Sequence, residues 1–485
     1  MSQKAAAVMN LENELKGLDL RDARRNRRHL SIVNEVAANP DASFPDLASN
    51  DAELAAIYRH FNNPKVTLQR CLEPHAAATA TRCAQERLIL SAHDTSEAAF
   101  PGDKRSGLGP LSGADRGFFV HVSLAMSADG LRRPLGVLAV DTWVRAEPEP
   151  PEPRSKKPRG KKSRSRKSRG GAGRYDDPTK ESMCWRRNID ACEKRLEGKA
   201  STIHLLDRGG DSYDLLAHLS QLRFVVRANH DRNVYDPGTQ EVLAKLRAVS
   251  ASAPLLLERE VVLSERLSKD GPKANRTHPP RRRRMAKLEV RATRVTLQRP
   301  RRWSEDLPPY LQLNLVHVTE RDCPEGEEPV EWLLYTSEPI GTAEEVAFVV
   351  DCYRARWLIE EYFKALKTGC SLEKRQLESL HALLNVLGTF VPIAWRLLLL
   401  RQVADVQPEA PATVALTPRQ LEVLRTVRKK EALPALPTIL QALMAIARLG
   451  GHLKHNGRPG WLVLGRGYEK LMAYEIGWVA ARSPP

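Results

Sequence analysis

The chain has 485 residues, of which 42% are hydrophobic and 28% charged, a composition typical of a globular protein of about three domains. Its formal net charge of +17 favours nucleic acid or an anionic membrane surface as a partner. A membrane span is not expected, because the most apolar run, 386–400, is interrupted by Pro392 and Arg396. The first residues lack the apolar core of a signal peptide, so we expect a cytoplasmic protein.

The seven cysteines are odd in number and form no C-x-x-C pair. This pattern predicts neither a zinc ribbon nor a disulfide framework. Any metal in this protein is therefore expected to be held by oxygen ligands.

The N-terminal region is predicted to be helical, with a basic segment at 21–30 and a periodic stretch at 52–63. A run of charges is usually a solvated face. In a basic protein, this run fits a helix that faces DNA equally well.

Short β-like runs follow, separated by Gly, Asp and Ser turns, and they predict a meander that begins a mixed sheet. A later turn, helix and strand form a β-α-β passage that ends at 223–229. The strands predicted before that passage closes are 87–95, 117–126, 135–144 and 202–207.

Two basic segments interrupt the predicted elements. Residues 147–174 alternate Pro, Gly and Ser with Lys and Arg, which predicts a disordered insertion that holds phosphates loosely. Residues 255–340 read mostly as strands around a polybasic patch at 281–284, so we expect an antiparallel β excursion with a charged loop. The chain beyond about 370 is predicted to be helical.

A helix is predicted over about 342–368. On a helical wheel Tyr353, Arg356, Glu360 and Lys367 fall within a stripe of about 60°, with apolar side chains opposite. By spacing alone this stripe is typical of a solvated helix face.

Two aspartates end predicted strands: Asp94 ends the first and Asp207 the fourth. Carboxylates in such places bind Mg²⁺, and a pair of Mg²⁺ ions stabilises both the attacking and the leaving oxygen of a phosphodiester. Taken singly, each aspartate is also typical of a turn or a helix N-cap.

The spacing Y-x2-R-x3-E-x6-K of the helix stripe resembles the signature of bacterial DDE cut-and-paste transposases of insertion-sequence family four. The resemblance implies an α/β fold with a ribonuclease H-like mixed-sheet catalytic core, an inserted antiparallel β subdomain, and helical N- and C-terminal domains. Collinear passages extend it over nearly the whole chain, at 55–66, 115–124, 206–216, 223–230, 331–340, 356–369 and 444–454.

The resemblance also implies domain limits. Residues 1–75 would form the transposon-end DNA-binding domain, 76–370 the catalytic core, and 371–485 a dimerisation and synapsis domain. The core would contain the basic insertion at 147–174 and a β subdomain at about 240–340.

By the same resemblance, Asp94, Asp207 and Glu360 are the catalytic residues and hold two Mg²⁺ ions, for which Mn²⁺ can substitute. The enzyme would bind the terminal inverted repeats of its element, cleave them by hydrolysis and transesterification through a hairpin, and join the 3′ ends to target DNA. Glu361 points about 100° away from Glu360 and is expected at the surface or behind the site.

Several residues are expected to contact DNA. Arg356 and Lys367 flank Glu360 at a reach that suits successive phosphates. The resemblance gives Trp332 the place of a flipped-base contact, although a Trp on an apolar strand is equally typical of a core. The expected contacts are Tyr353, Arg356, Lys367, Arg227, Trp332, Trp357, Arg24, Arg25, Arg27 and Arg28.

The implied partners are double-stranded DNA, both transposon ends and target, and a second copy of the chain in a synaptic homodimer. The implied location is the bacterial cytoplasm, at the nucleoid when DNA is bound. Two other interpretations stay open: a catalytically inactive or inhibitory end-binding protein, and a general nuclease, which would leave the helical ends unexplained. His93 stands where relatives commonly carry an acid, and it should point away from Asp94.

Overall fold

The structure, a computed structural model, describes residues 14–38, 42–102, 105–113, 115–147, 181–263, 265, 280–301, 303–428, 433–453 and 457–482. Most of the predicted basic insertion lies outside these residues. The chain divides into two compact units. The first unit consists of Met1–Glu152, Asn188–Ser201 and Trp357–Pro485, and the second of Pro153–Arg187 and Thr202–Arg356.

Helices begin the described part of the first unit, as the periodicity of the sequence predicts. Polar side chains start two of them: Asn50 accepts a hydrogen bond from the Glu53 amide, and Thr67 accepts one from the Arg70 amide. These caps satisfy amide groups that have no partner within the helix. The helices are α3 (Ala23–Ala38), α4 (Phe44–Leu47), α5 (Asp51–Phe61) and α6 (Leu68–Cys83).

An antiparallel sheet follows and confirms the predicted meander. β1 pairs with β3 and places Asp94 opposite Val122, and β3 also pairs with β4 and with the short β2. β1 continues past its predicted end at 95. The strands are β1 (Leu88–Phe100), β2 (Gly109–Pro110), β3 (Arg116–Ser127) and β4 (Pro134–Trp143).

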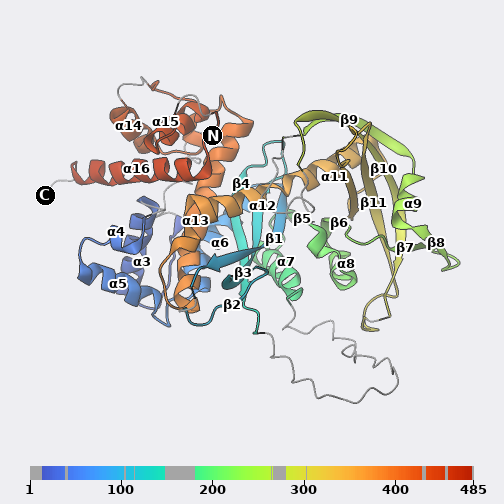
Figure 1. Ribbon diagram of the computed structural model, residues 1–485, viewed down its shortest axis with the longest axis horizontal. Coiled ribbons are helices and arrows are strands. Elements are labelled where there is room, and N and C mark those ends of the chain that lie inside the picture. Colours follow the sequence, from blue (N-terminus) through green and yellow to red (C-terminus); the bar gives the residue numbers. More distant parts are fainter. Residues whose placement is uncertain are drawn as a thin grey trace, which may run out of the picture. The chain divides into compact units, whose positions relative to one another are not determined.

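The C-terminal part of the first unit is helical, as predicted (Figure 1). Thr417 and Thr438 begin two of its helices with reciprocal capping hydrogen bonds. The elements are α12 (Leu358–Lys364), a π-helical segment (Ala365–Gly369), 3₁₀ turns (Leu372–Lys374 and Ala412–Val414), α13 (Leu380–Val406), α14 (Pro418–Val427), α15 (Ile439–Leu449) and α16 (Trp461–Ala480).

The interrupted apolar run belongs to α13, which continues through Pro392 and Arg396 for 27 residues. The interruptions do not end the helix, and by length and composition alone α13 could cross a membrane. However, 94% of its most apolar window is buried inside the protein, and α13 packs against α6, β4 and α15. It is the core helix of the first unit.

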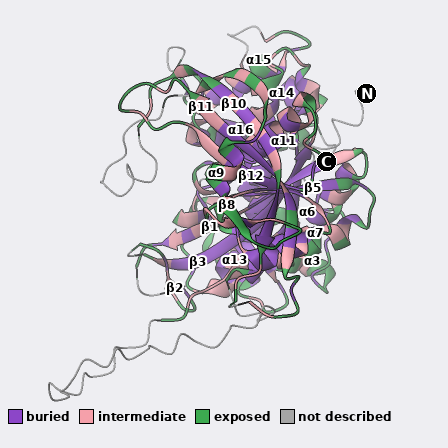
Figure 2. Ribbon diagram, turned by 90° about the vertical axis from the view of Figure 1, so that its right-hand side faces the viewer, coloured by how far each residue is buried: buried purple, intermediate pink, exposed green. Residues whose placement is uncertain are grey.

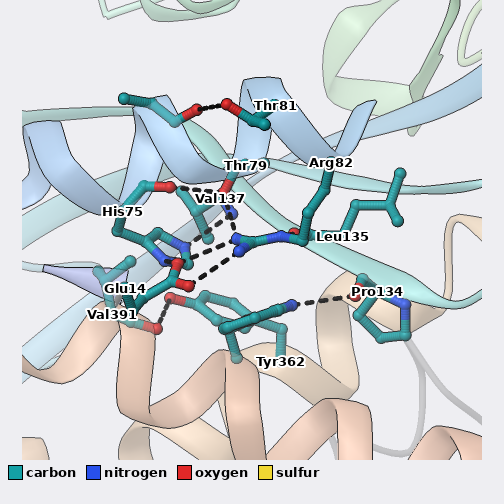
Figure 3. Close-up of polar contacts among 12 residues, drawn as sticks. Glu14, His75, Thr79, Thr81, Arg82, Pro134, Leu135, Val137, Tyr362 and Val391 are labelled. Atoms are coloured by element: carbon teal, nitrogen blue, oxygen red, sulfur yellow. Dashed lines mark hydrogen bonds and ion pairs between the residues drawn. The ribbon is translucent and has the colours of Figure 1, made fainter. Parts of the chain in front are cut away.

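A buried polar network joins several elements of the first unit (Figure 3). The Glu14 carboxylate accepts two hydrogen bonds from Arg82 and contacts Nδ1 of His75, both in α6. Arg82 Nε donates to the carbonyl of Leu135 in β4, and its guanidinium lies 4.2 Å from the ring centroid of Trp395 in α13. Because buried polar groups require partners, this network fixes how these helices meet β4.

The second unit begins with the predicted β-α-β passage, which the structure confirms. β5 and β6 are parallel neighbours, joined through a 3₁₀ turn and α8. The elements are β5 (Ser201–Leu206), the 3₁₀ turn (Arg208–Gly210), α8 (Tyr213–Leu219) and β6 (Arg223–Arg227).

The predicted β excursion is also confirmed. From β6 the sheet continues through β12, β11, β10 and β9, each antiparallel to its neighbour. α11 begins at Thr342 with a capping box and packs against β6, β9 and β11. The elements are β7 (Asn233–Tyr235), β8 (Val242–Lys245), α9 (Leu246–Ala251), β9 (Leu255–Leu263), β10 (Arg284–Gln298), β11 (Tyr310–Arg321), β12 (Glu331–Thr336) and α11 (Ala343–Ala355).

Buried residues concentrate in the strands of both units, drawn in purple in Figure 2. In β3 every residue from Gly117 to Ser127 is buried. The helix α7 (Met183–Leu196) contributes residues to both units. Strands embedded in a packed core are rigid supports for reactive side chains.

Candidate active site

Asp94 lies in β1 at the point where the strand leaves the core. The residues from Ile89 to His93 are buried, and Asp94 is the first partly exposed residue after them. Its Oδ1 accepts a hydrogen bond from the Thr95 amide at 2.7 Å. The strand therefore carries a carboxylate from a buried support to a partly exposed position.

The neighbours of Asp94 point to the opposite face of β1 and are tied to β3. His93 Nδ1 lies 2.9 Å from the Ser123 hydroxyl, and Thr95 Oγ1 lies 2.8 Å from Nδ1 of His121. His93 is fully buried, which agrees with the direction expected for its side chain. These cross-strand contacts hold the backbone of β1 on both sides of Asp94.

Glu360 lies in α12, which packs against β1 within the first unit. Ile359 and Tyr362 are fully buried, as the helical wheel predicts, and Glu360 is partly exposed. The Tyr362 hydroxyl donates to the carbonyl of Val391 in α13 at 3.4 Å (Figure 3). The structure therefore brings the elements that carry Asp94 and Glu360 into contact.

The prediction of one continuous helix over 342–368 was wrong. α11 ends at Ala355, α12 starts at Leu358, and the Glu360 amide donates to the carbonyl of Trp357 three residues earlier. No proline or glycine marks this break, so it has no local signal in the sequence. The two helices instead satisfy different tertiary contacts: α11 packs on strands of the second unit, and α12 on β1 and α13.

The stripe is altered further by the π-helical segment Ala365–Gly369, in which the Cys370 amide donates to the carbonyl of Ala365. This wider turn displaces Lys367 from the angle that a regular helix predicts. Lys367 Nζ donates to the main-chain carbonyl of Glu97 in β1 and lies 3.3 Å from Glu373. Lys367 thus links the segment that follows α12 to the strand that carries Asp94.

Asp207 follows β5 in the second unit, at the predicted strand end. Its Oδ1 accepts a hydrogen bond from the Gly209 amide at 2.8 Å and so caps the 3₁₀ turn. A Cβ at Gly209 would lie 3.0 Å from Oδ1 of Asp207 and 3.0 Å from the Trp185 ring. A side chain at this position would therefore crowd the Asp207 carboxylate.

The second unit also gathers four of the ten expected DNA contacts around Tyr353, which is buried. The ring of Trp332 meets that of Tyr353 edge to face, with centroids 5.4 Å apart. The guanidinium of Arg356 lies 5.8 Å from the Tyr353 ring centroid. Arg227 Nη2 donates to the carbonyl of Glu331, the neighbour of Trp332. These residues form the aromatic–arginine cluster: Tyr353, Trp332, Arg227 and Arg356.

Arg208 also lies near Arg227 of the aromatic–arginine cluster, and it was not predicted from the sequence. Burial lowers the pKa of Arg227, and the positive charges of Arg208 and Arg356 lower it further, while Tyr353 opposes them. Arg208 and Arg356 therefore each lie close enough for their charges to act on Arg227, and such a gathering of positive charge suits a site that receives a polyanion. The only sequence signal is that Arg208 directly follows Asp207.

The remaining expected contacts differ in exposure. Trp357 is 54% exposed, with Lys364 Nζ 5.7 Å from its ring centroid. It does not pack into a core. In α3, Arg25 donates to the carbonyl of Arg21 and is partly buried. The exposed arginines of α3 are Arg24, Arg27 and Arg28.

Within the described ranges, no group of three His, Cys, Asp or Glu side chains is gathered closely enough to hold a metal ion. Asp94 and Glu360 belong to the first unit and Asp207 to the second. The predicted donor set consists of carboxylate oxygens, which suit hard divalent cations such as Mg²⁺ and Mn²⁺. Its chemistry fits the ions that the sequence analysis expects.

Comparison with protein families identifies two regions of the chain. Residues 9–66, which include α3 to α5, match the family model described as transposase DNA-binding. Residues 188–389, which include Asp207 and Glu360, match the family model described as transposase DDE domain. A DDE domain implies a ribonuclease H-like fold and divalent metal ions. The chain therefore carries the DNA-binding and DDE domains of a DNA transposase, a metal-dependent enzyme that cleaves DNA and transfers its strands.

Proposed function

We propose that this transposase binds the terminal inverted repeats of its own element, excises the element through a hairpin intermediate and joins its 3′ ends to target DNA. The observation that carries the proposal is the packing of α12, with Glu360, against β1, with Asp94. Asp207 and Glu360 lie in the region that matches the DDE domain, and Asp94 lies before it. The finer resemblance, to insertion-sequence family four and to the Tn-five transposase, belongs to the same proposal.

The proposed catalytic carboxylates are Asp94, Asp207 and Glu360, with two Mg²⁺ ions as cofactors and Mn²⁺ as a substitute. Two such ions, when bound, supply electrostatic stabilisation to the attacking and leaving oxygens of a phosphodiester. The amides of Thr95 and Gly209 each hold one oxygen of an aspartate and so orient Asp94 and Asp207. Preorganised ligands of this kind reduce the cost of assembling the site.

In the proposed reaction, water first cleaves a phosphodiester at each transposon end and leaves a 3′ hydroxyl. That hydroxyl attacks the opposite strand, which closes a hairpin and releases the flanking DNA. A second hydrolysis reopens the hairpin and restores the 3′ hydroxyl for attack on the target. Each step exchanges one phosphorus–oxygen bond for another, so no covalent protein intermediate is needed.

The aromatic–arginine cluster is the proposed DNA-holding surface of the second unit. Its guanidinium groups would contact phosphates, and Trp332 would stack on a base displaced by the hairpin. Edge-to-face contact with Tyr353 holds the Trp332 ring in one orientation. Lys367 and the exposed Trp357 would contact the same DNA from the first unit.

The outer parts of the chain are proposed to recognise ends and to pair protomers. Residues 1–75 would bind the transposon end through exposed arginines of α3. Residues 76–370 would form the catalytic core that cleaves and joins DNA, and residues 371–485 would support a synaptic homodimer. The inserted β subdomain, at about 240–340, would belong to the catalytic part. The proposed location is the bacterial cytoplasm, at the nucleoid when DNA is bound.

The function is tested with purified protein, Mg²⁺ and DNA that carries the inverted repeats flanking the gene. Nicks, hairpins and strand-transfer products are expected, and Asp207→Asn and Glu360→Gln should abolish all three while end binding persists. Glu361→Gln is the matched control: Glu361 is adjacent to Glu360 but is not a proposed metal ligand, so this variant should keep its activity. End binding without any cleavage by the unaltered protein would instead favour an inhibitory end-binding protein.

A further inference from the structure

The first residue of α16, Trp461, is hydrogen-bonded to the neighbour of the proposed catalytic glutamate. Its indole Nε1 donates to Oε2 of Glu361 at 3.0 Å, while Lys364 Nζ lies 2.6 Å from Oε1. Both carboxylate oxygens of Glu361 are therefore engaged, one by Trp461 and the other by Lys364.

Trp461 is itself held firmly. Its side chain is 7% exposed, and the guanidinium of Arg401 in α13 lies 4.4 Å from its ring centroid. Asp405 lies 4.0 Å from Arg401 and 2.9 Å from Arg458, just before α16. The start of α16 is thus fixed between α13 and α12, and the indole N–H faces one carboxylate oxygen.

One turn later, α16 meets the segment that follows α12 backbone to backbone. A Cβ at Gly465 would lie 2.5 Å from the carbonyl oxygen of Gly369, the last residue of the π-helical segment. On the same helix, a Cβ at Gly467 would lie 1.8 Å from the carbonyl of Ile446 in α15. Glycine at these places lets α16 approach at a distance that any side chain would prevent.

These contacts hold α12 and the π-helical segment at two points, Glu361 and Gly369. Trp461 holds Glu361 in the first turn of α12, and Gly465 abuts Gly369 where the π-helical segment ends. Glu360 directly precedes the first of these points, and Lys367, which faces β1, lies between the two. A π-helical turn is rare and occurs mostly as a single turn, frequently at a functional site.

We propose that Trp461 is a positioning residue for Glu360: through Glu361, α16 sets the distance of the Glu360 carboxylate from β1 and hence the affinity for the catalytic metal. This inference rests on the proposed role of Glu360 as a metal ligand. The C-terminal helices would then have a second role beside the proposed pairing of protomers. A shift of α16 would alter the position of Glu360 through the hydrogen bond between Trp461 and Glu361.

The test measures Mn²⁺ binding by electron paramagnetic resonance and cleavage as a function of Mn²⁺ concentration. Trp461→Phe keeps the ring on Arg401 but removes the donor, so both the dissociation constant and the half-saturating concentration should rise about tenfold, the scale known for groups that support metal ligands. Maximal cleavage at saturating Mn²⁺ and end-binding affinity should stay within about twofold. Trp303→Phe, in the second unit, is the control with the same substitution.

A second pair of variants tests the same hydrogen bond from the Glu361 side, so that the inference can still be tested if Trp461→Phe misfolds. Glu361→Gln retains an acceptor for the indole and should stay near the unaltered protein, whereas Glu361→Ala should reproduce the tenfold weakening. An unchanged Mn²⁺ requirement in both Trp461→Phe and Glu361→Ala would overturn the inference. If Glu360→Gln kept normal Mn²⁺ binding and cleavage, the proposed function itself would fail, which is a distinguishable result.

Discussion

The carboxylate of Glu14 lies 2.5 Å from Nδ1 of His75, and both side chains are buried. His75 Nε2 accepts a hydrogen bond from the Val137 amide, so Nδ1 carries the proton and donates it to Glu14. Glu14 lies within the region that matches the transposase DNA-binding family, and His75 lies beyond it. A neutral histidine therefore joins the region that matches the transposase DNA-binding family to α6 and β4.

The first prediction concerns this junction. Glu14→Gln leaves an acceptor for His75 but removes the charge opposite Arg82, so the free energy of unfolding should fall by about 3 kcal/mol. Chemical denaturation followed by circular dichroism measures the loss. Glu86→Gln, which breaks the more exposed pair with Arg133, should cost less than about 1 kcal/mol. Equal effects of the two variants would show that the buried network adds no stability.

The second prediction is a loss of stability in mild acid that originates in α3 and α5. His29 Nδ1 lies 3.1 Å from Nε2 of His60, and burial together with His60 lowers the pKa of His29 to about 3. Because the folded pKa lies below the unfolded value of 6.5, protons favour the unfolded state as the pH falls. His29 should thus contribute fully above pH 6.5 and lose about 2 kcal/mol by pH 5.

Denaturation at pH 7 and pH 5 tests this pair. The loss between the two values should shrink in His29→Asn and remain in His230→Asn, whose side chain is exposed. The stabilising contribution of Glu14 should be lost only in stronger acid, as the pH falls from 4.5 toward 2, since His75 and Arg82 outweigh its burial and lower its pKa from 4.5 to about 2. A pH dependence that is the same in all three proteins would refute the assignment to His29.

Strand positions were predictable because their apolar runs and bounding turns are local. The order of β1, β3, β4, β5 and β6 follows directly from those runs. The break at Arg356 and Trp357 could not be predicted, since it arises from tertiary contacts of α11 and α12 rather than from a breaking residue. Arg208 and Glu14 were missed for a related reason: an isolated charged residue looks the same in sequence whether it is solvated or buried against a partner.

The third prediction tests the turn after β5. Gly209→Ala places a methyl group 3.0 Å from Oδ1 of Asp207, a contact closer than most Cβ groups make, so the carboxylate should shift. Cleavage should drop at least about tenfold, because small misplacements of catalytic groups are costly, while affinity for the transposon end stays unchanged. Gly130→Ala, where a Cβ meets open space, is the control. Normal cleavage by Gly209→Ala would show that the turn does not position Asp207.

The last prediction distinguishes the arginines of α3 that contact DNA from the one that stabilises the helix. Arg24, Arg27 and Arg28 are exposed and spaced to share one helix face, so each should contribute a phosphate contact. Alanine at any one of them should weaken end binding and reduce the slope of log affinity against log salt by about 1. Fluorescence anisotropy across a KCl series measures both quantities.

Arg25 should behave differently, because its guanidinium donates to the carbonyl of Arg21 at 2.9 Å and its side chain is only 18% exposed. Arg25→Ala should therefore lower the stability of the N-terminal helices and leave the salt slope unchanged. A reduced slope in Arg25→Ala would place Arg25 on DNA despite its internal hydrogen bond. An unchanged slope in all four alanine variants would exclude this face of α3 as the end-binding surface.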